Sequence, residues 1–444
     1  MTSPRIVLAT VGSLGDLHPF IAIGLALKAR GASPVLAVPE DHLARCRAAG
    51  LRAEAILPSF AEVGRATGLS DEEVVRRVLG DNHFLVGRVL LPPLGDSVER
   101  LLRIGQGADA IAGSAFTFAA PIAAERLELP FVHTVLQPMS WFSAGDPPSG
   151  PNFRAAARPP LGRAGLAWNR LILESGRRYM RLRYGRVIDR VRAAHGLPRT
   201  RAAPLVDAGT RPALSIGTYS PIFAPLPSDA PQPAAVTGWP WYDADEDAHA
   251  ALDPELAAFL DGGTPPLVVS LGSFVPYSDT DLYGRAAEMT GRLGMRAVLL
   301  TGESEVRGSR DVLVRRYAPH SLLFPRAAAV VHHGGIGTTG QALRSGRPQL
   351  VTPFMGDQPD NAARVERLGV GLRCAPERFG RDAGTLIARL LREPAFAGRA
   401  GELGALVAAE DGAGAAADAM LALVRRPAGP APSADKACPA PRAG

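Results

Sequence analysis

Lysine is nearly absent from this chain of 444 residues, because only Lys28 and Lys436 are lysines among its 49 lysine and arginine residues. A predominance of arginine is typical of GC-rich coding. The net charge of +6 and the pI of about 9.6 therefore do not by themselves indicate a nucleic-acid partner, and we expect none.

Cysteine is also scarce, and the apolar runs are short. Cys46, Cys374 and Cys438 show no C-x-x-C spacing, which predicts free thiols in a reducing compartment. No apolar run approaches the ~20 residues of a membrane span, and Ile6–Val11 is too short for a signal-peptide core. These absences predict a cytoplasmic protein without stable membrane insertion.

The first glycine-containing turn lacks both common nucleotide-binding motifs. The run Gly12-Ser13-Leu14-Gly15-Asp16 follows an apolar strand but matches neither G-x-G-x-x-G nor G-K-[ST]. A dinucleotide fingerprint and a P-loop are therefore excluded here. Asp16 and His18 instead place groups capable of acid-base chemistry beside the end of the strand.

The composition that is present predicts two domains. A hydrophobic content of 46% with 21% charged residues is typical of a globular protein, and 444 residues are enough for two cores. Strand-like runs alternate with helical segments, so we expect α/β domains with parallel sheets. The predicted divisions are a first domain over 1–218, a proline-rich linker region over 219–262, a second domain over 263–424 and a disordered tail over 425–444.

The expected elements follow from hydrophobic periodicity and from helix start and stop signals. The expected strands are Arg5–Val11, Ser33–Pro39, Arg52–Leu57, Asp109–Gly113, Phe131–Leu136, Ala213–Gly217, Pro266–Leu271, Arg296–Thr301, Asp311–Arg315, Ala327–Val331 and Gln349–Pro353. The expected helices are Pro19–Arg30, Asp71–Arg103, Phe116–Leu127, Ala164–Ala194, Asp281–Leu293, one beginning near Thr338, Asp382–Arg392 and Gly401–Val424.

One stretch, 330–361, carries the strongest functional signal. A strand ends at His332 and His333, and glycines then open a tight turn into a helix. A helix N-terminus with nearby glycines is suited to an anion, since its N-H groups lack partners and ligands can approach the main chain closely. His333, Thr338, Gln341, Asp357 and Gln358 follow in an order that suggests a diphosphate with a sugar attached.

The segments HHGGIGTTGQAL and PFMGDQPDNA within this stretch resemble the donor-binding signature of family 1 nucleotide-sugar glycosyltransferases. The resemblance runs from RIVLATVGSLGDLHPF to about Val424 and is closest to the bacterial macrolide, rhamnolipid-type and sterol-glucosyltransferase-like branch. It implies the GT-B architecture, with two Rossmann-like domains whose parallel sheets face a central cleft and a terminal helix that returns to the first domain. It also implies metal-independent transfer with inversion, using a UDP- or dTDP-sugar as co-substrate and no cofactor.

The same resemblance assigns donor-binding roles. Tyr317 would stack on the base, and Ser273, Thr338, His333 and Gly335 would surround the diphosphate.

Asp357 and Gln358 would bond sugar hydroxyls. Many relatives have Glu at the position of Gln341, where a carboxylate accepts from both ribose hydroxyls. An amide accepts hydrogen bonds from two hydroxyls less well than a carboxylate does. A donor that contains a deoxyribose is therefore an alternative to a UDP-sugar.

The general base has two candidates. Plant members of the family carry a catalytic His oriented by a distant Asp, and here Asp16 and Ser114 hold these places. An aspartate base would be hindered by a second carboxylate, so the two changes are mutually consistent and favour Asp16. His18 competes, because its ordinary pKa near 6.5 suits general-base work; it could equally be a structural residue at a helix start.

The acceptor site is predicted to lie in the first domain. Phe116 and the loop residues Met139, Trp141 and Phe142 would suit a small, largely apolar acceptor such as a polyketide, lipid or sterol-like compound. The loop aromatics could equally form a lid that packs on its own core.

Charged segments leave two further alternatives. The range 154–211 holds fourteen arginines against three acidic residues, so its helix could touch an anionic membrane or present a solvated basic face, with Leu171, Ile172, Tyr179, Leu182 and Ile188 available to pack. The acidic run 243–247 resembles a D-x-D metal site but is predicted to be a solvated turn.

For the whole chain, the alternatives are a nucleotide-sugar epimerase or hydrolase, and an inactive partner of another transferase. The oligomeric state is not predicted.

Overall fold

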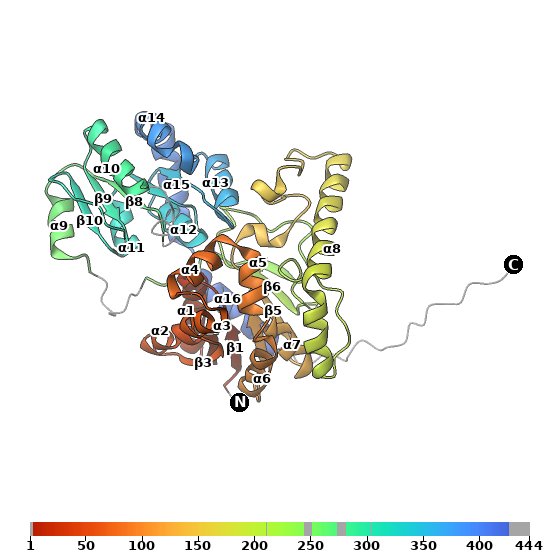
Figure 1. Ribbon diagram of the computed structural model, residues 1–444. Coiled ribbons are helices and arrows are strands. Elements are labelled where there is room, and N and C mark those ends of the chain that lie inside the picture. The colour runs from red at the N-terminus through yellow and green to blue at the C-terminus, as the bar shows by residue number, and fades with distance from the viewer. Residues whose placement is uncertain (1–2, 210, 244–250, 273–280, 303, 426–444) are drawn as a thin grey trace.

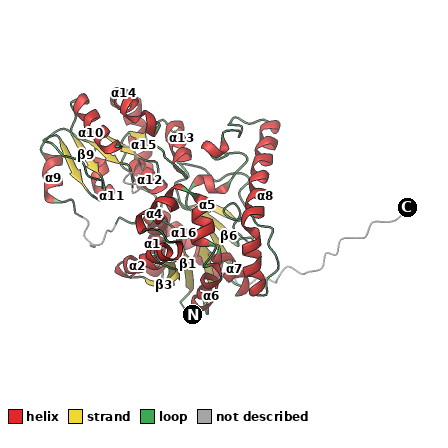
Figure 2. Cartoon of the chain, in the orientation of Figure 1, coloured by secondary structure: helices red, strands yellow, loops and turns green. Residues whose placement is uncertain are grey.

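The computed structural model contains two parallel sheets, each in its own α/β domain (Figure 1). The structure describes residues 3–209, 211–243, 251–272, 281–302 and 304–425. The predicted disordered tail therefore lies outside the described residues, except for Arg425. Helices cover both faces of the two sheets (Figure 2), which confirms the predicted fold class.

The first sheet has the order β3-β2-β1-β4-β5-β6-β7 among the described residues. Its strands are β1 Arg5–Ala9, β2 Ser33–Pro39, β3 Arg52–Leu57, β4 Ala110–Gly113, β5 Phe131–Val135, β6 Leu214–Gly217 and β7 Ala234–Val236. The chain leaves the sheet edge at β3 and returns beside β1 as β4. In open α/β sheets a ligand crevice forms at such a switch point, outside the carboxyl ends of the strands, which here is above Gly12.

The second sheet has the order β10-β9-β8-β11-β12-β13 in the described part of the chain. Its strands are β8 Leu267–Ser270, β9 Ala297–Leu300, β10 Val312–Arg315, β11 Ala329–His332, β12 Gln349–Val351 and β13 Gly371–Arg373. Its switch point lies between β8 and β11. The turn after β11 that carries His333 therefore stands where this topology places a ligand.

Helices lie between many of the consecutive strands, as crossover connections in parallel sheets require, and the last three helices follow the final strand. In the first domain they are α1 Leu14–Ala29, α2 Leu43–Ala48, α3 Phe60–Thr67, α4 Asp71–Gly80, α5 Asn82–Phe84, α6 Leu94–Ile104, α7 Ala119–Arg126 and α8 Arg163–Ala194. After the first sheet they are α9 Pro254–Asp261, α10 Leu282–Leu293, α11 His320–Leu323, α12 Ile336–Arg344, α13 Gln358–Arg367, α14 Phe379–Arg392, α15 Pro394–Ala408 and α16 Gly412–Arg425.

Helix α1 begins earlier than predicted, at Leu14, and Pro19 lies inside it. Ser13 is the N-cap: its Oγ accepts from Gly15 N-H, while the Asp16 carboxylate accepts from Ser13 N-H at 2.8 Å. This capping box satisfies N-H groups that a start at Pro19 would leave exposed. Asp16 and His18 are therefore helical residues and not part of a loose turn.

Two long predicted helices are divided. The segment 71–103 breaks into α4, α5, a π-helical turn at Leu85–Leu90 and α6. Pro92 and Pro93 account for the last of these breaks, because they cannot continue the preceding helical turn. The segment 401–424 breaks between α15 and α16.

The predicted linker region 219–262 is more structured than expected, since β7 extends the first sheet and α9 packs on the second domain through Leu256 and Leu260.

Helix α8 has the predicted length but a different packing face. Ile188 and Tyr184 are buried against the first domain, whereas Leu171, Tyr179 and Leu182 are exposed. Figure 1 shows α8 at the edge of the first domain. Leu171 and Leu182 therefore do not pack as expected, whereas the half-exposed Tyr179 keeps an edge contact with the His83 ring, with 6.1 Å between centroids.

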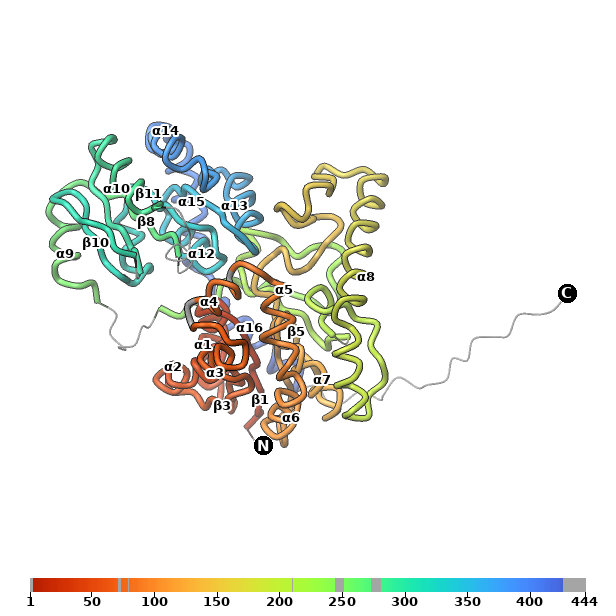
Figure 3. Tube along the Cα trace, viewed as in Figure 1, coloured from red at the N-terminus to blue at the C-terminus, as the bar shows by residue number. Residues whose placement is uncertain are grey.

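The last helix returns to the first domain. Ala416, Ala417, Met420 and Leu421 of α16 join the apolar core around α1, and Arg30 Nε donates to Asp418 Oδ1 at 2.6 Å. The tube in Figure 3 shows this blue segment beside the red start of the chain. The two ends of the described chain therefore share one core.

Leu421→Ala is expected to lower the free energy of unfolding by about 2–5 kcal/mol, because Leu421 is 3% exposed within the core of the opposite end of the sequence. Leu406→Ala is the control: that side chain is 53% exposed, and its change should stay within about 0.5 kcal/mol. Urea unfolding measures both. Equal small losses would show that α16 is not an integral part of the first domain.

Candidate active site

The turn between β11 and α12 brings backbone N-H groups to the switch point of the second sheet. Gly334 has φ of +92°, and a Cβ there would lie 2.7 Å from Val351 Cγ1, so this position requires glycine. Gly335 is the N-cap of α12. The first helical turn therefore presents N-H groups without intrahelical partners and the positive end of the helix dipole, which together favour an anion.

The two consecutive histidines have different environments. His332 is fully buried, its Nδ1 accepts from Gly334 N-H, and its Nε2 pairs with Gln349 Oε1 at 2.9 Å, so it holds the turn. His333 lies against Gly272, where an added Cβ would come within 2.8 Å of its ring. Burial lowers the pKa of His333 to about 4, so the ring is neutral at pH 7 in the ligand-free protein.

The Asp357 carboxylate connects two helices of the second domain. Its Oδ2 accepts from Ile336 N-H at the start of α12 and from Asn361 Nδ2 on α13, at 3.1 and 2.7 Å. Burial is the main cause that raises the pKa of Asp357 to about 7, and the charge of Asp16 adds to it. Gln358 beside it accepts through Oε1 from the N-H groups of Phe354 and Met355.

Asp16 of the first domain also lies near this site, because its charge contributes to the raised pKa of Asp357. Burial raises the pKa of Asp16 above its ordinary 3.8, although the bonds from Ser13 and the nearby His42 oppose this. His42 contacts the same turn through Nε2 and the carbonyl oxygen of Gly12, at 2.9 Å. His18, two residues along the helix, lies instead against the Tyr242 ring, with 5.4 Å between centroids.

The remaining donor-site candidates are distributed along α12 and beyond. Thr338 is the third residue of α12, and Gln341 lies one turn further on. The Tyr317 ring is 58% exposed and stacks beside His320, with 6.4 Å between centroids. Ser273 lies outside the described residues.

The aromatic residues of the predicted acceptor loop are largely used in packing. Trp141 is buried and donates through Nε1 to Tyr219 Oη within a core shared by both domains. Phe142 adopts φ of +47° and lies near Phe153, with 6.3 Å between ring centroids.

Met139 in this loop and Phe116 are half-buried, and Phe116 packs on the first-domain core. Trp141 is therefore a packing residue, in a core that both domains build.

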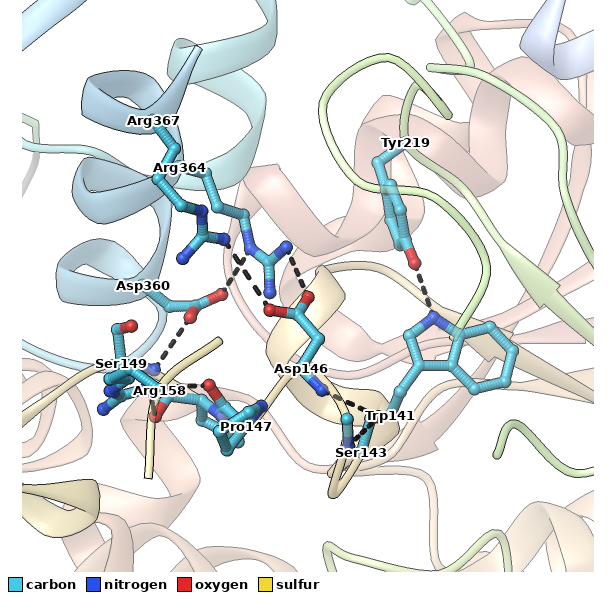
Figure 4. A network of polar contacts seen from close by, with 12 residues as sticks. Trp141, Ser143, Asp146, Pro147, Ser149, Arg158, Tyr219, Asp360, Arg364 and Arg367 are labelled. Carbon is cyan, nitrogen blue, oxygen red and sulfur yellow. Dashed lines mark hydrogen bonds and ion pairs between the residues drawn. The ribbon is translucent and has the colours of Figure 1, made fainter. Parts of the chain in front are cut away.

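A buried ion-pair network joins this loop to α13 (Figure 4). Arg364 is 2% exposed and donates to Asp360 Oδ2 on its own helix, and it pairs with Asp146 of the loop at 2.7 Å. Ser149 N-H donates to Asp360 Oδ1, and Arg367 approaches Asp146. The loop is thereby fixed to the helix that begins beside Asp357.

A groove of about 1190 Å³ lies between the domains along α13. Residues of the loop 143–159 and of the segment 222–228 line one side of it. Helix α13 lines the other side through Pro359, Ala363, Arg364, Glu366, Arg367 and Leu368.

Four residues at or beside the site were not predicted from the sequence, namely His42, Asp146, Asn361 and Arg364. For Asn361, the spacing of four residues from Asp357 was an available signal. Asp146 and Arg364 are far apart in the chain, and no local pattern connects them.

Comparison with known proteins decides the family. Residues 305–422 match the family model described as the C-terminal domain of erythromycin biosynthesis protein CIII-like proteins. The chain is 32% identical over 435 residues to O-mycaminosyltylonolide 6-deoxyallosyltransferase of Streptomyces fradiae, covering 92% of this chain and 94% of that protein. The chain is a family 1 glycosyltransferase.

Other relatives agree with this assignment. Vancomycin aglycone glucosyltransferase of Amycolatopsis orientalis is 30% identical to this glycosyltransferase, with 83% and 85% of the two chains covered. The fold of this chain is similar to that of the kitacinnamycin glycotransferase, with a TM-score of 0.69 at 19% identity. The match covers 95% of this chain and 100% of the other. A spinosyn rhamnosyltransferase complexed with thymidine diphosphate has a TM-score of 0.64 at 20% identity, with 94% and 100% covered.

Among the residues that the structure describes, no group of three or more His, Cys, Asp or Glu side chains could hold a metal ion. None of the described helices is long and apolar enough to span a membrane.

Asp243 belongs to an ordered contact and not to a solvated turn, because it pairs with Arg344 at 2.6 Å. The expectation of a solvated acidic turn was therefore wrong at Asp243; residues 244–247 lie outside the described part.

Arg364→Met is expected to lower the free energy of unfolding by about 3–5 kcal/mol, because Asp360 loses its buried counter-charge. Asp146→Asn should cost less, since Asp360 and Arg364 stay paired.

Arg389→Met is the matched control, because Arg389 and Glu393 have the same four-residue spacing on an exposed helix face, where a pair contributes about 0.3–0.5 kcal/mol. Urea unfolding separates the three variants. A loss for Arg364→Met as small as that of the control would contradict the importance of the buried network.

Proposed function

We propose that this glycosyltransferase transfers a sugar from a dTDP- or UDP-sugar to a hydroxyl of a small, largely apolar acceptor, with inversion and without a metal. The observation that carries the proposal is the proximity of two units from different domains. The turn at Gly334 and Gly335 offers an anion cradle, and Asp16 lies close enough to raise the pKa of Asp357 beside that cradle. A leaving diphosphate and a base for the acceptor then meet at one site.

The proposed reaction is a single displacement. The acceptor oxygen attacks the anomeric carbon, the bond from that carbon to the diphosphate oxygen breaks, and the acceptor proton passes to the Asp16 carboxylate. The bonding electrons leave with the nucleoside diphosphate. N-H groups of α12 and the Thr338 hydroxyl would stabilise its growing negative charge.

In its protonated form, His333 would donate a hydrogen bond to the diphosphate. Its pKa of about 4 in the ligand-free protein reflects burial, and a diphosphate placed against it would favour the protonated form. Its Nδ1 is buried and has no hydrogen-bond partner among the described residues. Such an atom is suited to a ligand that completes its bonding.

The donor nucleotide is proposed from the comparisons. Structures of similar fold contain thymidine diphosphate. Gln341, in place of the Glu of many relatives, is compatible with a deoxyribose. The names of two relatives, O-mycaminosyltylonolide 6-deoxyallosyltransferase and vancomycin aglycone glucosyltransferase, support a natural product as acceptor.

The transfer is tested by incubating the protein with dTDP- and UDP-sugars and a panel of hydroxyl-bearing polyketides and sterols, with and without EDTA. We expect a glycoside whose anomeric configuration is opposite to that of the donor, formed at a similar rate in EDTA because no step uses a metal. Chromatography and NMR measure both. Loss of turnover in EDTA, restored by magnesium or manganese, would contradict metal independence. Sugar release or epimerisation without a glycoside would favour the alternative enzymes.

Asp16→Asn is expected to lower kcat by about 10²–10⁴-fold while leaving nucleotide affinity nearly unchanged, because it removes the general base but keeps the side-chain shape. His18→Ala should cost less, since that ring packs on Tyr242. In the parent enzyme, activity should fall as pH drops through the Asp16 pKa, which burial holds above 3.8. Steady-state kinetics and calorimetry measure these effects. Near-normal turnover in Asp16→Asn with a collapse in His18→Ala would transfer the role to His18.

A further inference from the structure

The linker residue Asp243 binds the helix that forms the anion cradle. Gln341 Nε2 donates to Asp243 Oδ1 at 2.7 Å, and Arg344 Nη1 donates to Asp243 Oδ2 at 2.6 Å. The Arg344 guanidinium also lies over the Trp241 ring, 4.7 Å from its centroid. Both carboxylate oxygens are thereby occupied by side chains of α12.

This contact determines which way the Gln341 amide faces. A carboxylate accepts hydrogen bonds and cannot donate them, so the NH₂ group of Gln341 must point toward Asp243. The amide oxygen Oε1 then points away from the linker. It is buried and has no hydrogen-bond partner among the described residues, an unusual state for a buried acceptor.

The position of Gln341 indicates what would satisfy that oxygen. Gln341 lies one helical turn beyond Thr338 and therefore on the same face of α12, which begins at the anion cradle. A hydroxyl donor next to a bound diphosphate is a ribose hydroxyl of the nucleotide.

We propose that Asp243 is a positioning residue that orients the Gln341 amide, so that Oε1 accepts from a ribose hydroxyl of the donor nucleotide. The inference rests on the proposed function, since it requires a nucleotide at α12.

In the pair of Gln341 and Asp243 the amide donates and the carboxylate accepts, and two substitutions together can exchange these roles. Gln341→Glu alone sets a carboxylate against the carboxylate of Asp243, which is repulsive. Asp243→Asn alone lets two amides pair in either direction, so Gln341 can turn its NH₂ group toward the ribose. The double variant Asp243→Asn with Gln341→Glu restores an amide facing an acid, and an acceptor oxygen again faces the nucleotide.

The experiment compares nucleotides that differ only in the hydroxyl. Calorimetry gives Kd for thymidine diphosphate and uridine diphosphate and for their 3′-deoxy analogues, with the parent enzyme and the three variants. We expect the parent to bind the hydroxyl-bearing form about 5- to 10-fold more tightly, the contribution of one hydrogen bond. The ratio of the Kd of the 3′-deoxy analogue to the Kd of the hydroxyl-bearing nucleotide should approach one in each single variant. It should return toward the parent value in the double variant.

Asp253→Asn is the matched control, because Asp253 also precedes the second sheet and pairs with an arginine, Arg315 at 2.5 Å, but does not contact α12 through that pair. It should leave the ratio unchanged. If Asp243 had a purely structural role, its substitution would weaken the binding of the hydroxyl-bearing and the 3′-deoxy nucleotide by the same factor. An unchanged ratio in Asp243→Asn and Gln341→Glu would overturn this inference but not the proposed function. A ratio that stays near one in the double variant would also overturn it. Failure of the parent enzyme to bind either diphosphate would overturn the proposed function itself.

Discussion

The hydrogen bond from Ile336 N-H to the Asp357 carboxylate is the interaction on which the site depends. It joins the start of α12, which forms the anion cradle, to the start of α13. Helix dipoles favour a negative group at both of these N-termini, so one buried carboxylate serves two helices. Burial is the main cause that raises the Asp357 pKa to about 7, and the charge of Asp16 from the first domain adds to it.

The same helix α13 fixes the relation between the domains. Near its start Asn361 donates to the carbonyl oxygen of Gly334 in the anion cradle, and further along Arg364 reaches Asp146 in the first-domain loop that also contains Trp141. Buried ion pairs are costly to desolvate and contribute little net stability, but they are strongly unfavourable to separate. We infer that Asp146, Arg364 and Asp360 specify how the loop sits on α13 more than they strengthen the fold. Linker residues add a second connection, since Trp239 packs against Gly340 of α12.

The ligand-free site is arranged to be completed by a negatively charged ligand. His333 is neutral because burial lowers its pKa to about 4, and its Nδ1 lacks a partner among the described residues. An arriving diphosphate would favour its protonation and use the N-H groups of the first turn of α12. These groups are held in place by glycines at Gly334 and Gly335 and by the buried His332, so little reorganisation is needed when charge develops.

The sequence by itself determined the two parallel α/β domains, the family and the strand, turn and helix unit at His333, because periodicity and glycine spacing are local and the donor motif is contiguous. It misplaced the start of α1 at Pro19, since the capping box of Ser13 and Asp16 outweighed the proline signal, and it missed β7 because three proline-flanked residues have no strand pattern of their own. Only the tertiary structure decided that Asp16 approaches Asp357, that Trp141 is buried on Tyr219, and that Asp243 faces Gln341. In most of these pairs the two residues are about a hundred positions or more apart in the chain. Hydrogen bonds, burial and pKa shifts depend on distances in space, and no local pattern of side chains contains those distances.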